Sequence, residues 1–409
     1  MRPVVILHYH EIALKGGNRD LFERQLVANV RQVLWGIPGV EVRRMSGRIA
    51  VRMTEEVASM VSAGDMSAVV TKLRRVFGVA NLRVGYEVRA DAEGIAEDAV
   101  QLVQQHMAAR AHTQPKTFAV RVKRSIKTYP EHSMDMERRI GAAVHVATGL
   151  GVDLEHPDLM VAIEVVERTA FVLLEKIPGP GGLPVGASDR VLALLSSGFD
   201  SPVAAWKLMR RGCVVDCIHF HSYPFTSDAS MRNVAAIVQR LANWGGSHVL
   251  YFVPLAEFQK CVLTTTPSEL RVVLYRRMMI RVAEVIAQRA GALALVTGES
   301  VGQVASQTIP NIAAVDAVAG MPVLRPLIGE DKQDIISQAT MIGTADISAL
   351  PYDDCCSLFT PQHPATRARL IDCEAAEHAL QVDEWLPRLC AQVTSMRIAA
   401  DTPPTDMVR

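Results

Sequence analysis

The sequence lacks a long apolar run and an excess of charge of either sign. No stretch approaches the ~20 consecutive apolar residues that cross a bilayer, so we expect no membrane segment. The 43 basic and 43 acidic side chains cancel. A role in nucleic-acid binding therefore cannot be argued from overall charge and would have to rest on local patches.

Cysteine is also sparse. The seven cysteines are an odd number and none is spaced C-x-x-C, which excludes a regular disulfide framework and speaks against an iron–sulfur cluster. The segment Met1–Leu7 runs directly into polar sequence without a small-residue cleavage site, so we interpret it as a first strand rather than a signal peptide. Both features favour a cytoplasmic protein.

What is present suits several packed domains. The chain has 409 residues, of which 49% are hydrophobic and 21% charged. This length predicts two or three domains, and this composition argues against long disordered regions.

The most informative segment is a turn between an apolar run and a helix. Val191 to Leu195 predicts a buried strand, and Ser196-Ser197-Gly198 follows directly. Pro202 then fits the first turn of a helix that Gly212 ends. Free backbone N–H groups at such a helix start can hold an anion. No G-K-[ST] follows, so the turn is not a Walker loop.

The C-terminal half alternates strands with helices, which predicts a doubly wound parallel sheet with ligands at the carboxyl ends of its strands. The expected strands are 191–195, 214–219, 248–253, 293–297 and 323–325, and the expected helices include 229–244, 270–289 and 332–341.

Other polar residues should meet the turn at the same edge. His219 and Phe220 end one strand, Gly298 follows another, and Gln307 lies in a segment rich in small residues. Arg276, on a helix, could clamp phosphates. The alternatives are that Phe220 belongs to the core and that Arg276 is solvated.

The N-terminal half differs in pattern. Residues 1–60 and 61–172 each predict a small α+β unit, and the Pro/Gly-rich stretch 173–189 predicts a linker before a domain over 190–409. Within 61–172, one half-exposed strand and its surroundings carry cations without an acid among them: Lys116, Arg121, Lys123, Arg124 and Lys127. They could bind RNA phosphates or form an ordinary solvated face.

Cys355 and Cys356 follow a polar, proline-containing segment that should be an accessible loop. A thiol there could act as a nucleophile or sulfur carrier if cations lower its pKa. The alternative is a buried apolar filler.

Taken in order, these motifs resemble the tRNA 4-thiouridine synthetase (tRNA uridine 4-sulfurtransferase, ThiI) family over nearly the whole chain. The matching pieces are 11–19, 120–124, 133–134, 181–186, 196–201, 219–222, 276–279, 297–300, 302–307, 325–327 and 351–356. Ser197 departs from the family's S-G-G-x-D-S turn, where glycine is usual, and would be strained if the turn required positive φ.

The resemblance implies a ferredoxin-like domain, a THUMP domain that binds tRNA through the cations named above, and an ATP-pyrophosphatase domain. It implies an ATP site with Asp200 ordering the loop or holding Mg²⁺. The implied ATP-site residues are Leu194, Leu195, Ser196, Ser197, Gly198, Ser201, His219, Phe220, Arg276, Gly298 and Gln307.

The implied reaction adenylates uridine 8 of tRNA, after which a persulfide on Cys355, with Cys356 as its competitor, displaces AMP and leaves 4-thiouridine. Only residues 368–409 follow Arg367, which is too short for the family's rhodanese domain. We therefore expect direct loading by a cysteine desulfurase, and the family's part in thiamine synthesis is in doubt. By family analogy the chain could form a homodimer.

Two other functions share these motifs. One is a different tRNA chemistry on the same loop, such as 2-thiolation or amidation, against which the THUMP-like half argues. The other is a tRNA-binding protein whose ATP chemistry is lost, which the serine at position 197 suggests.

Overall fold

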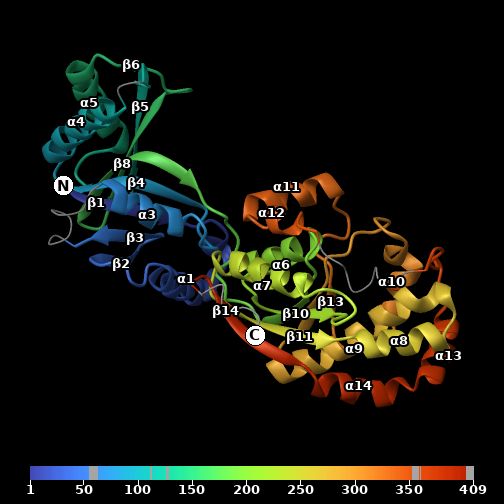
Figure 1. The fold of residues 1–409 in the computed structure, drawn as a ribbon. Helices are drawn as coiled ribbons and strands as arrows, with labels where there is room; N and C mark the ends of the chain where they lie inside the picture. Colours follow the sequence, from blue (N-terminus) through green and yellow to red (C-terminus); the bar gives the residue numbers. More distant parts are fainter. Residues whose placement is uncertain (55–62, 111–112, 126–128, 352–358, 360, 402–409) are drawn as a thin grey trace. The chain divides into compact units, whose positions relative to one another are not determined.

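The computed structural model describes residues 1–54, 63–110, 113–125, 129–351, 359 and 361–401. The chain divides into two compact units, Met1–Pro184 (unit 1) and Val185–Arg409 (unit 2) (Figure 1). No helix in the described part of the chain combines the length and the hydrophobicity needed to span a bilayer. Cys355, Cys356 and Lys127 lie outside the described residues.

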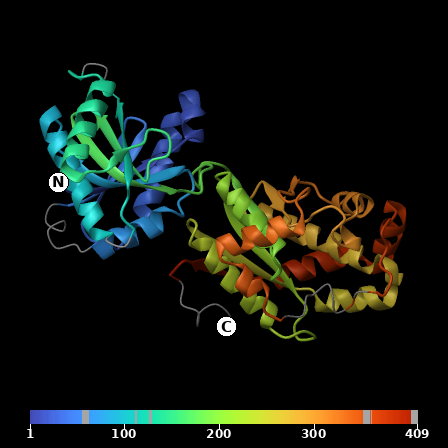
Figure 2. The ribbon, with the colours of Figure 1, turned by 90° about the horizontal axis from the view of Figure 1, so that it is seen from above.

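Unit 1 is an eight-stranded sheet with helices, as the α+β pattern predicts. The sheet order is β2-β3-β1-β4-β8-β7-β5-β6, so strands far apart in sequence lie side by side, blue beside green in Figure 2. Its regular elements are β1 (Arg2–His8), α1 (Arg19–Val33), β2 (Val40–Met45), β3 (Arg48–Met53), α3 (Ala63–Leu73), β4 (Asn81–Val88), α4 (Ala92–Ala109), β5 (Thr117–Arg124), α5 (Ser133–Thr148), β6 (Gly151–Val152), β7 (Leu159–Val166) and β8 (Thr169–Pro178).

One face of this sheet is covered by two pairs of helices. Leu26 of α1 and Leu73 of α3 pack with Val5 of β1, whereas Ile95 of α4 and Ile140 of α5 pack in a second cluster. α3 packs with the first strands of the sheet. The residues up to the start of β4 therefore belong to the first α+β half, which extends past the boundary predicted at residue 60. β8 also continues through the start of the predicted linker.

The sheet is curled, so that side chains on its opposite face meet one another. Arg48 of β3 is paired with Glu164 of β7, although three strands separate them in the sheet. The register shifts at Gly85 of β4, where a Cβ would lie 2.0 Å from the carbonyl oxygen of Val172. Only glycine fits this contact, and such a bulge increases the local bend and twist.

Unit 2 is a doubly wound α/β domain, which confirms the predicted fold class. Its sheet order is β13-β12-β9-β10-β11-β14. The elements are β9 (Arg190–Leu194), α6 (Asp200–Arg210), β10 (Val214–His221), α7 (Ala229–Ala242), β11 (Ser247–Pro254), α8 (Ala256–Thr265), α9 (Arg271–Ala290), β12 (Ala294–Val296), η4 (Ala305–Gln307), α10 (Ile309–Asp316), β13 (Val323–Leu324), α11 (Lys332–Ile342), α12 (Ala345–Ser348), α13 (Leu370–Leu380), α14 (Val382–Ala391) and β14 (Thr394–Ala399).

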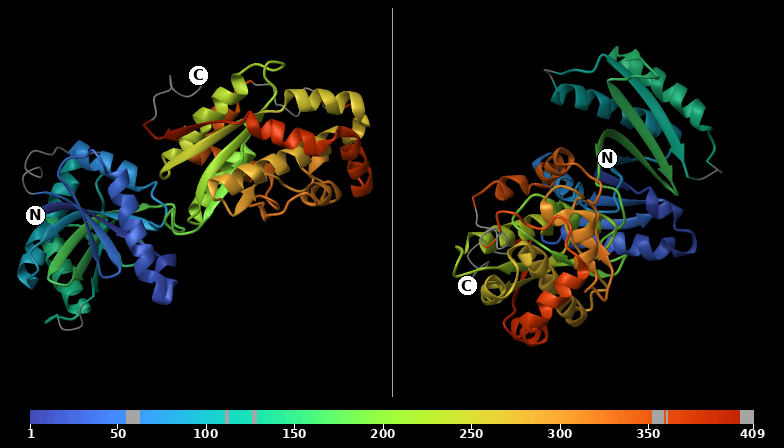
Figure 3. Two further views of the ribbon diagram at one scale, coloured as in Figure 1. Left: turned by 90° about the horizontal axis from the view of Figure 1, so that it is seen from below. Right: turned by 90° about the vertical axis from the view of Figure 1, so that its right-hand side faces the viewer.

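The strand order of unit 2 reverses between β9 and β12. From β9 the chain proceeds through β10 to β11 and then returns to the other side of β9 with β12. Ligands of open α/β sheets bind at such a switch point. The C-terminal β14, red in Figure 3 (left), adds an antiparallel edge strand beside β11.

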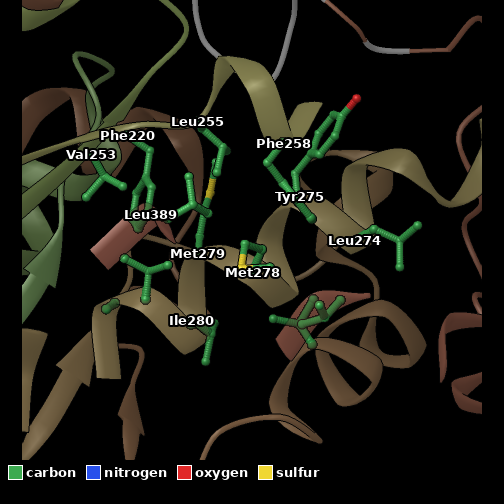
Figure 4. Packing of buried hydrophobic residues seen from close by; sticks show 14 of the residues in the cluster. Phe220, Val253, Leu255, Phe258, Leu274, Tyr275, Met278, Met279, Ile280 and Leu389 are labelled. Atoms are coloured by element: carbon green, nitrogen blue, oxygen red, sulfur yellow. The ribbon is translucent and has the colours of Figure 1, made fainter. Parts of the chain in front are cut away.

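One large part of the core of unit 2 lies between its sheet and α9. Phe220, Val253 and Leu255 meet Met278 and Met279 of α9 in a single buried cluster (Figure 4). This packing holds α9 against the sheet and so positions Arg276, one turn away on the same helix.

Candidate functional site: an anion loop in a cavity at the strand switch

The loop between β9 and α6 is held by two serines. The Ser201 hydroxyl accepts a hydrogen bond from the Ser196 N–H (2.9 Å) and lies 3.1 Å from the Ser196 hydroxyl. The Gly198 N–H points to the same Ser196 hydroxyl (3.4 Å). The loop is therefore preformed, with the N-terminal amides of α6 at its end, and this arrangement suits an anion.

Strand β12 brings a second loop against the first. A Cβ at Gly298 would lie 2.6 Å from the backbone nitrogen of Ser201. Only glycine permits this approach, which brings the loop after β12 into contact with the start of α6 at the strand switch.

Asp200 of the loop is bound by side chains from distant segments. Lys332 Nζ lies 2.6 Å from Asp200 Oδ1, and Gln303 Nε2 donates to Oδ2 at 2.9 Å. The carboxylate thus ties the loop to the start of α11 and to the segment before η4.

A second carboxylate, Glu299, lies between two arginines. Arg276 and Arg325 both pair with it, and the Thr297 hydroxyl donates to it at 2.7 Å. Burial alone would raise the pKa of Glu299, but the two guanidinium groups outweigh burial and lower it. Arg276 also donates to the Ser306 carbonyl (2.8 Å), so it is an ordered part of the wall and not a solvated arginine.

His219 joins the loop to β10. Its Nδ1 lies 2.8 Å from the Leu195 carbonyl and therefore carries the proton, and its Nε2 lies 3.3 Å from the Ser230 hydroxyl. Burial lowers the pKa of His219 to about 4, so the ring is neutral at physiological pH and positions the loop without adding charge.

These groups surround one cavity of about 580 Å³. The predicted residues that line it are Leu194, Leu195, Ser196, Gly198, Asp200, Ser201, His219, Phe220, Arg276, Gly298 and Gln307. The wall also includes residues that the sequence analysis did not assign to a site, above all Phe199, Glu299, Gln303 and Lys332. Lys332 had no local signal, because only the fold brings it to Asp200, whereas Gln303 lies in the segment 302–307 that the sequence analysis singled out.

Ser197 is the predicted ATP-site residue that does not line this cavity. It is 1% exposed, and its hydroxyl has no hydrogen-bond partner among the described residues. The non-glycine residues with positive φ in the described ranges are Glu167 and Gln381. The turn therefore does not require positive φ at Ser197, and serine fits without backbone strain.

A metal would have few ligands from the chain. Among the described residues, no group of three or more His, Cys, Asp or Glu side chains could hold a metal ion. Asp200 and Glu299 are the carboxylates of the cavity wall. One carboxylate fits Mg²⁺ that arrives with phosphate oxygens and water, which is its usual mode of binding.

The cationic strand of unit 1 is only partly free for RNA. Arg121 and Lys123 of β5 and Lys116 before it are exposed. Arg124, in contrast, donates to Ser133 Oγ (3.0 Å) and to the carbonyl of Glu131 (2.7 Å). Its guanidinium thus orders the start of α5, and its contact with RNA stays a prediction.

A polar cavity of about 340 Å³ continues this surface. It is lined by His106, Arg110 and Lys116, together with Asp158. The Asp158 carboxylate is occupied by the backbone N–H groups of Lys116 and Thr117. Arg110 and Lys116 therefore face the cavity beside Asp158, whose charge offsets part of theirs.

Four of the five described cysteines are buried: Cys213, Cys217, Cys373 and Cys390. Burial raises the pKa of each, which keeps these thiols protonated and unreactive. Cys261 is partly exposed. The four buried thiols are therefore unsuited to carry sulfur, and the predicted Cys355 and Cys356 lie outside the described residues.

Three sequence-family models match the chain in order. The model of the ThiI ferredoxin-like domain matches residues 4–82, the THUMP domain matches residues 89–175, and the model described as thiamine biosynthesis protein (ThiI) matches residues 186–382.

Curated relatives match over most of their length. The chain is 42% identical over 369 residues to a probable tRNA sulfurtransferase of Brevibacillus brevis, covering 90% of this chain and 89% of that protein. It is 38% identical to the probable tRNA sulfurtransferase of Moorella thermoacetica, with 100% of both chains covered.

Solved structures agree with these matches. A 4-thiouridine synthetase in complex with RNA and bound ATP superposes with a TM-score of 0.87 at 33% identity, covering 97% of this chain and 100% of that one. PH1313 from Pyrococcus horikoshii shares the fold, with a TM-score of 0.62 at 22% identity, covering 84% and 100% of the two chains. The chain belongs to the ThiI family, whose relatives named above are probable tRNA sulfurtransferases.

Proposed function

We propose that this chain is an ATP-dependent tRNA sulfurtransferase that converts uridine 8 to 4-thiouridine in the cytoplasm. The observation that carries the proposal is the preformed anion loop, Ser196 to Ser201, in a cavity at the strand switch of unit 2. A relative of the same family with bound ATP and RNA supports the choice of nucleotide and partner.

In this proposal the loop amides and the hydroxyls of Ser196 and Ser201 bind the phosphates of ATP. Arg276 and Lys332, which line the same cavity, balance their charge. Mg²⁺ bound by Asp200 and the phosphates would neutralise further charge on the leaving pyrophosphate. Charge that develops on the α-phosphate is stabilised by donors already in place.

The uridine 4-oxygen attacks the α-phosphate and releases pyrophosphate, so that the oxygen becomes part of a good leaving group. The terminal sulfur of a Cys355 persulfide then attacks C4 and AMP leaves. A second thiol cleaves the S–S bond and forms a disulfide with Cys355, which an external dithiol reduces. Cys356 or an external thiol serves as that second thiol, and a cysteine desulfurase supplies the sulfur.

The test is a reaction of the full chain with ATP, Mg²⁺, a cysteine desulfurase with L-cysteine as the sulfur source, a dithiol and unmodified tRNA. We expect AMP and a nucleoside with the near-UV absorbance of 4-thiouridine, and neither product from a tRNA with cytidine at position 8. A 2-thionucleoside would favour the alternative chemistry, and RNA binding without AMP would favour a binding protein. Sedimentation of the same sample tests the predicted homodimer.

A further inference from the structure

The segment that leaves the carboxyl end of β10 exposes two aromatic side chains. β10 carries His219 and Phe220 in the cavity wall, and residues 222–228 continue from it towards α7. Tyr223 is 53% exposed and Phe225 is 42% exposed. Large aromatic side chains exposed at the carboxyl edge of the sheet, where ligands bind, indicate an interaction site.

The rings stand on a rigid, buried base. The Ser222 hydroxyl donates to Gln259 Oε1 of α8 at 2.6 Å, and both residues are fully buried. The N–H groups of Phe225 (2.8 Å) and Thr226 (3.3 Å) donate to the Ser222 carbonyl. The segment is therefore a closed turn with its aromatic side chains held outwards.

A cation lies over one of the two rings, that of Phe225. Lys260 Nζ of α8 lies 4.1 Å from the centroid of the Phe225 ring and 3.2 Å from Glu257 Oε1. Exposed aromatic rings with a cation beside them match a ligand that combines a flat base with a phosphate. An apolar protein segment would instead desolvate the ammonium group at a cost.

We propose that Tyr223 and Phe225 form a stacking platform for an unstacked base of the RNA segment that carries the reacting uridine, with Lys260 beside the backbone phosphate. This inference rests on the proposed function. A base within a stacked RNA cannot present its 4-position to a cavity, and an aromatic platform offsets the loss of stacking. Tyr223 and Phe225 are thus positioning residues for the substrate and not part of the ATP site.

The first test compares three variants of the full chain. Tyr223→Ala/Phe225→Ala should lower the single-turnover rate of thionucleoside formation at saturating tRNA by about 10-fold to 100-fold. Its thermal stabilisation by ATP and its Kd for tRNA should stay close to wild type. Tyr223→Phe/Phe225→Tyr keeps two rings and should retain the rate. Leu293→Ala, at the opposite end of β12 and 61% exposed, is the matched control for loss of an exposed apolar side chain.

The second test needs no variant. tRNA with 5-iodouridine at the target position or at either neighbour is irradiated on the wild-type chain, and the crosslinked peptide is identified by mass spectrometry. We expect a crosslink to Tyr223 or Phe225 from one of these positions. Crosslinks that all map elsewhere, or a double-alanine variant with the wild-type rate, would overturn the platform. If wild type forms no thionucleoside at all, the proposed function has failed instead.

Discussion

The two sheets of this chain use polar residues in opposite ways. In unit 1, a mostly antiparallel sheet curls until charged side chains on its inner face pair with one another, as Glu164 does with Arg48 and His8. In unit 2, polar residues gather at the carboxyl ends of a mostly parallel sheet. There Asp200, Arg276 and Lys332, from three helices, face a cavity.

The difference follows from strand direction. Parallel strands bring all their carboxyl ends to one edge, so side chains from distant segments meet around space that a ligand can fill. The curled sheet has no such edge, and its inner ion pairs stabilise the fold, whereas we expect outer cations such as Lys123 to bind RNA. Each prediction below tests this separation of chemistry from recognition.

The largest effect is expected at the cysteines. Cys355→Ser should abolish thiolation over multiple turnovers, because no persulfide can form, while adenylation of the tRNA, seen as released pyrophosphate, stays nearly intact. Thionucleoside and pyrophosphate are measured in the same reaction. Cys261→Ser, at the one described cysteine that is not buried, is the control and should be fully active. Full activity of Cys355→Ser would move the role to Cys356.

The next effect is expected at the anion loop. Asp200→Ala removes the partner of Lys332 and Gln303 and should lower the rate of AMP formation about 100-fold, because the loop and its ligand lose their alignment. The Kd for tRNA should change little, since the proposed RNA face lies in unit 1. Unchanged AMP release would remove Asp200 from the site, and a large loss of tRNA affinity would break the separation of the two units.

A buried triad of unit 2 should matter for stability and not for chemistry. Glu377 accepts hydrogen bonds from Arg277 (2.8 and 2.7 Å), which is 2% exposed, and also pairs with Arg281. Glu377→Gln leaves a buried guanidinium without its counter-charge and should lower the free energy of unfolding by about 3–5 kcal/mol.

Urea unfolding followed by tryptophan fluorescence measures this loss, since Trp206, Trp244 and Trp385 lie in unit 2. Burial alone would raise the pKa of Glu377, but the arginines outweigh it and lower the pKa below its ordinary 4.5. The loss in free energy of unfolding relative to wild type should therefore be complete above pH 4.5. It should shrink as the pH falls through the lower pKa that Glu377 has in the folded chain. The exposed pair of Arg369 and Asp372 provides the control, Asp372→Asn, which should unfold like wild type.

A smaller effect is expected on the outer face of β5. Arg121→Ala/Lys123→Ala should weaken tRNA binding about tenfold and reduce the slope of log K against log salt by about 1–2, because two phosphate contacts are lost. The rate of AMP formation at saturating tRNA should not change. Arg124→Ala should instead reduce stability. If the double variant also lost AMP formation at saturating tRNA, the separate roles of the two units would be contradicted.

The smallest effect is expected at Ser197. Ser197→Gly should leave AMP formation within about twofold of wild type, because the turn holds no strain at this position and the hydroxyl has no partner. A large loss would show that the hydroxyl contacts the nucleotide after all.

Much of the architecture could be predicted because it is local. Apolar runs bounded by polar turns identified β1, β9 and β10, and the alternation of strands with helices identified the parallel sheet. The anion loop was visible because its strand, turn and helix are contiguous in sequence.

What could not be predicted depends on contacts between distant segments. β14 has an exposed, polar pattern and exists because β11 offers it an edge. The approach of Lys332 to Asp200 and the structural role of Arg124 are likewise products of tertiary packing. At the start of α5, His132 occupies the N-cap position, and the Ser133 hydroxyl accepts a hydrogen bond from Arg124 of β5.

The missing side chain at Gly298 has an electrostatic consequence. Because the backbone of residue 298 touches that of Ser201 directly, no water molecule fits between the end of β12 and the first turn of α6. The peptide dipoles of α6 are thus shielded from solvent on that side, and their field acts on a bound anion through a medium of low polarisability. A methyl group at position 298 would do more than crowd the helix: it would let in the solvent that weakens this field.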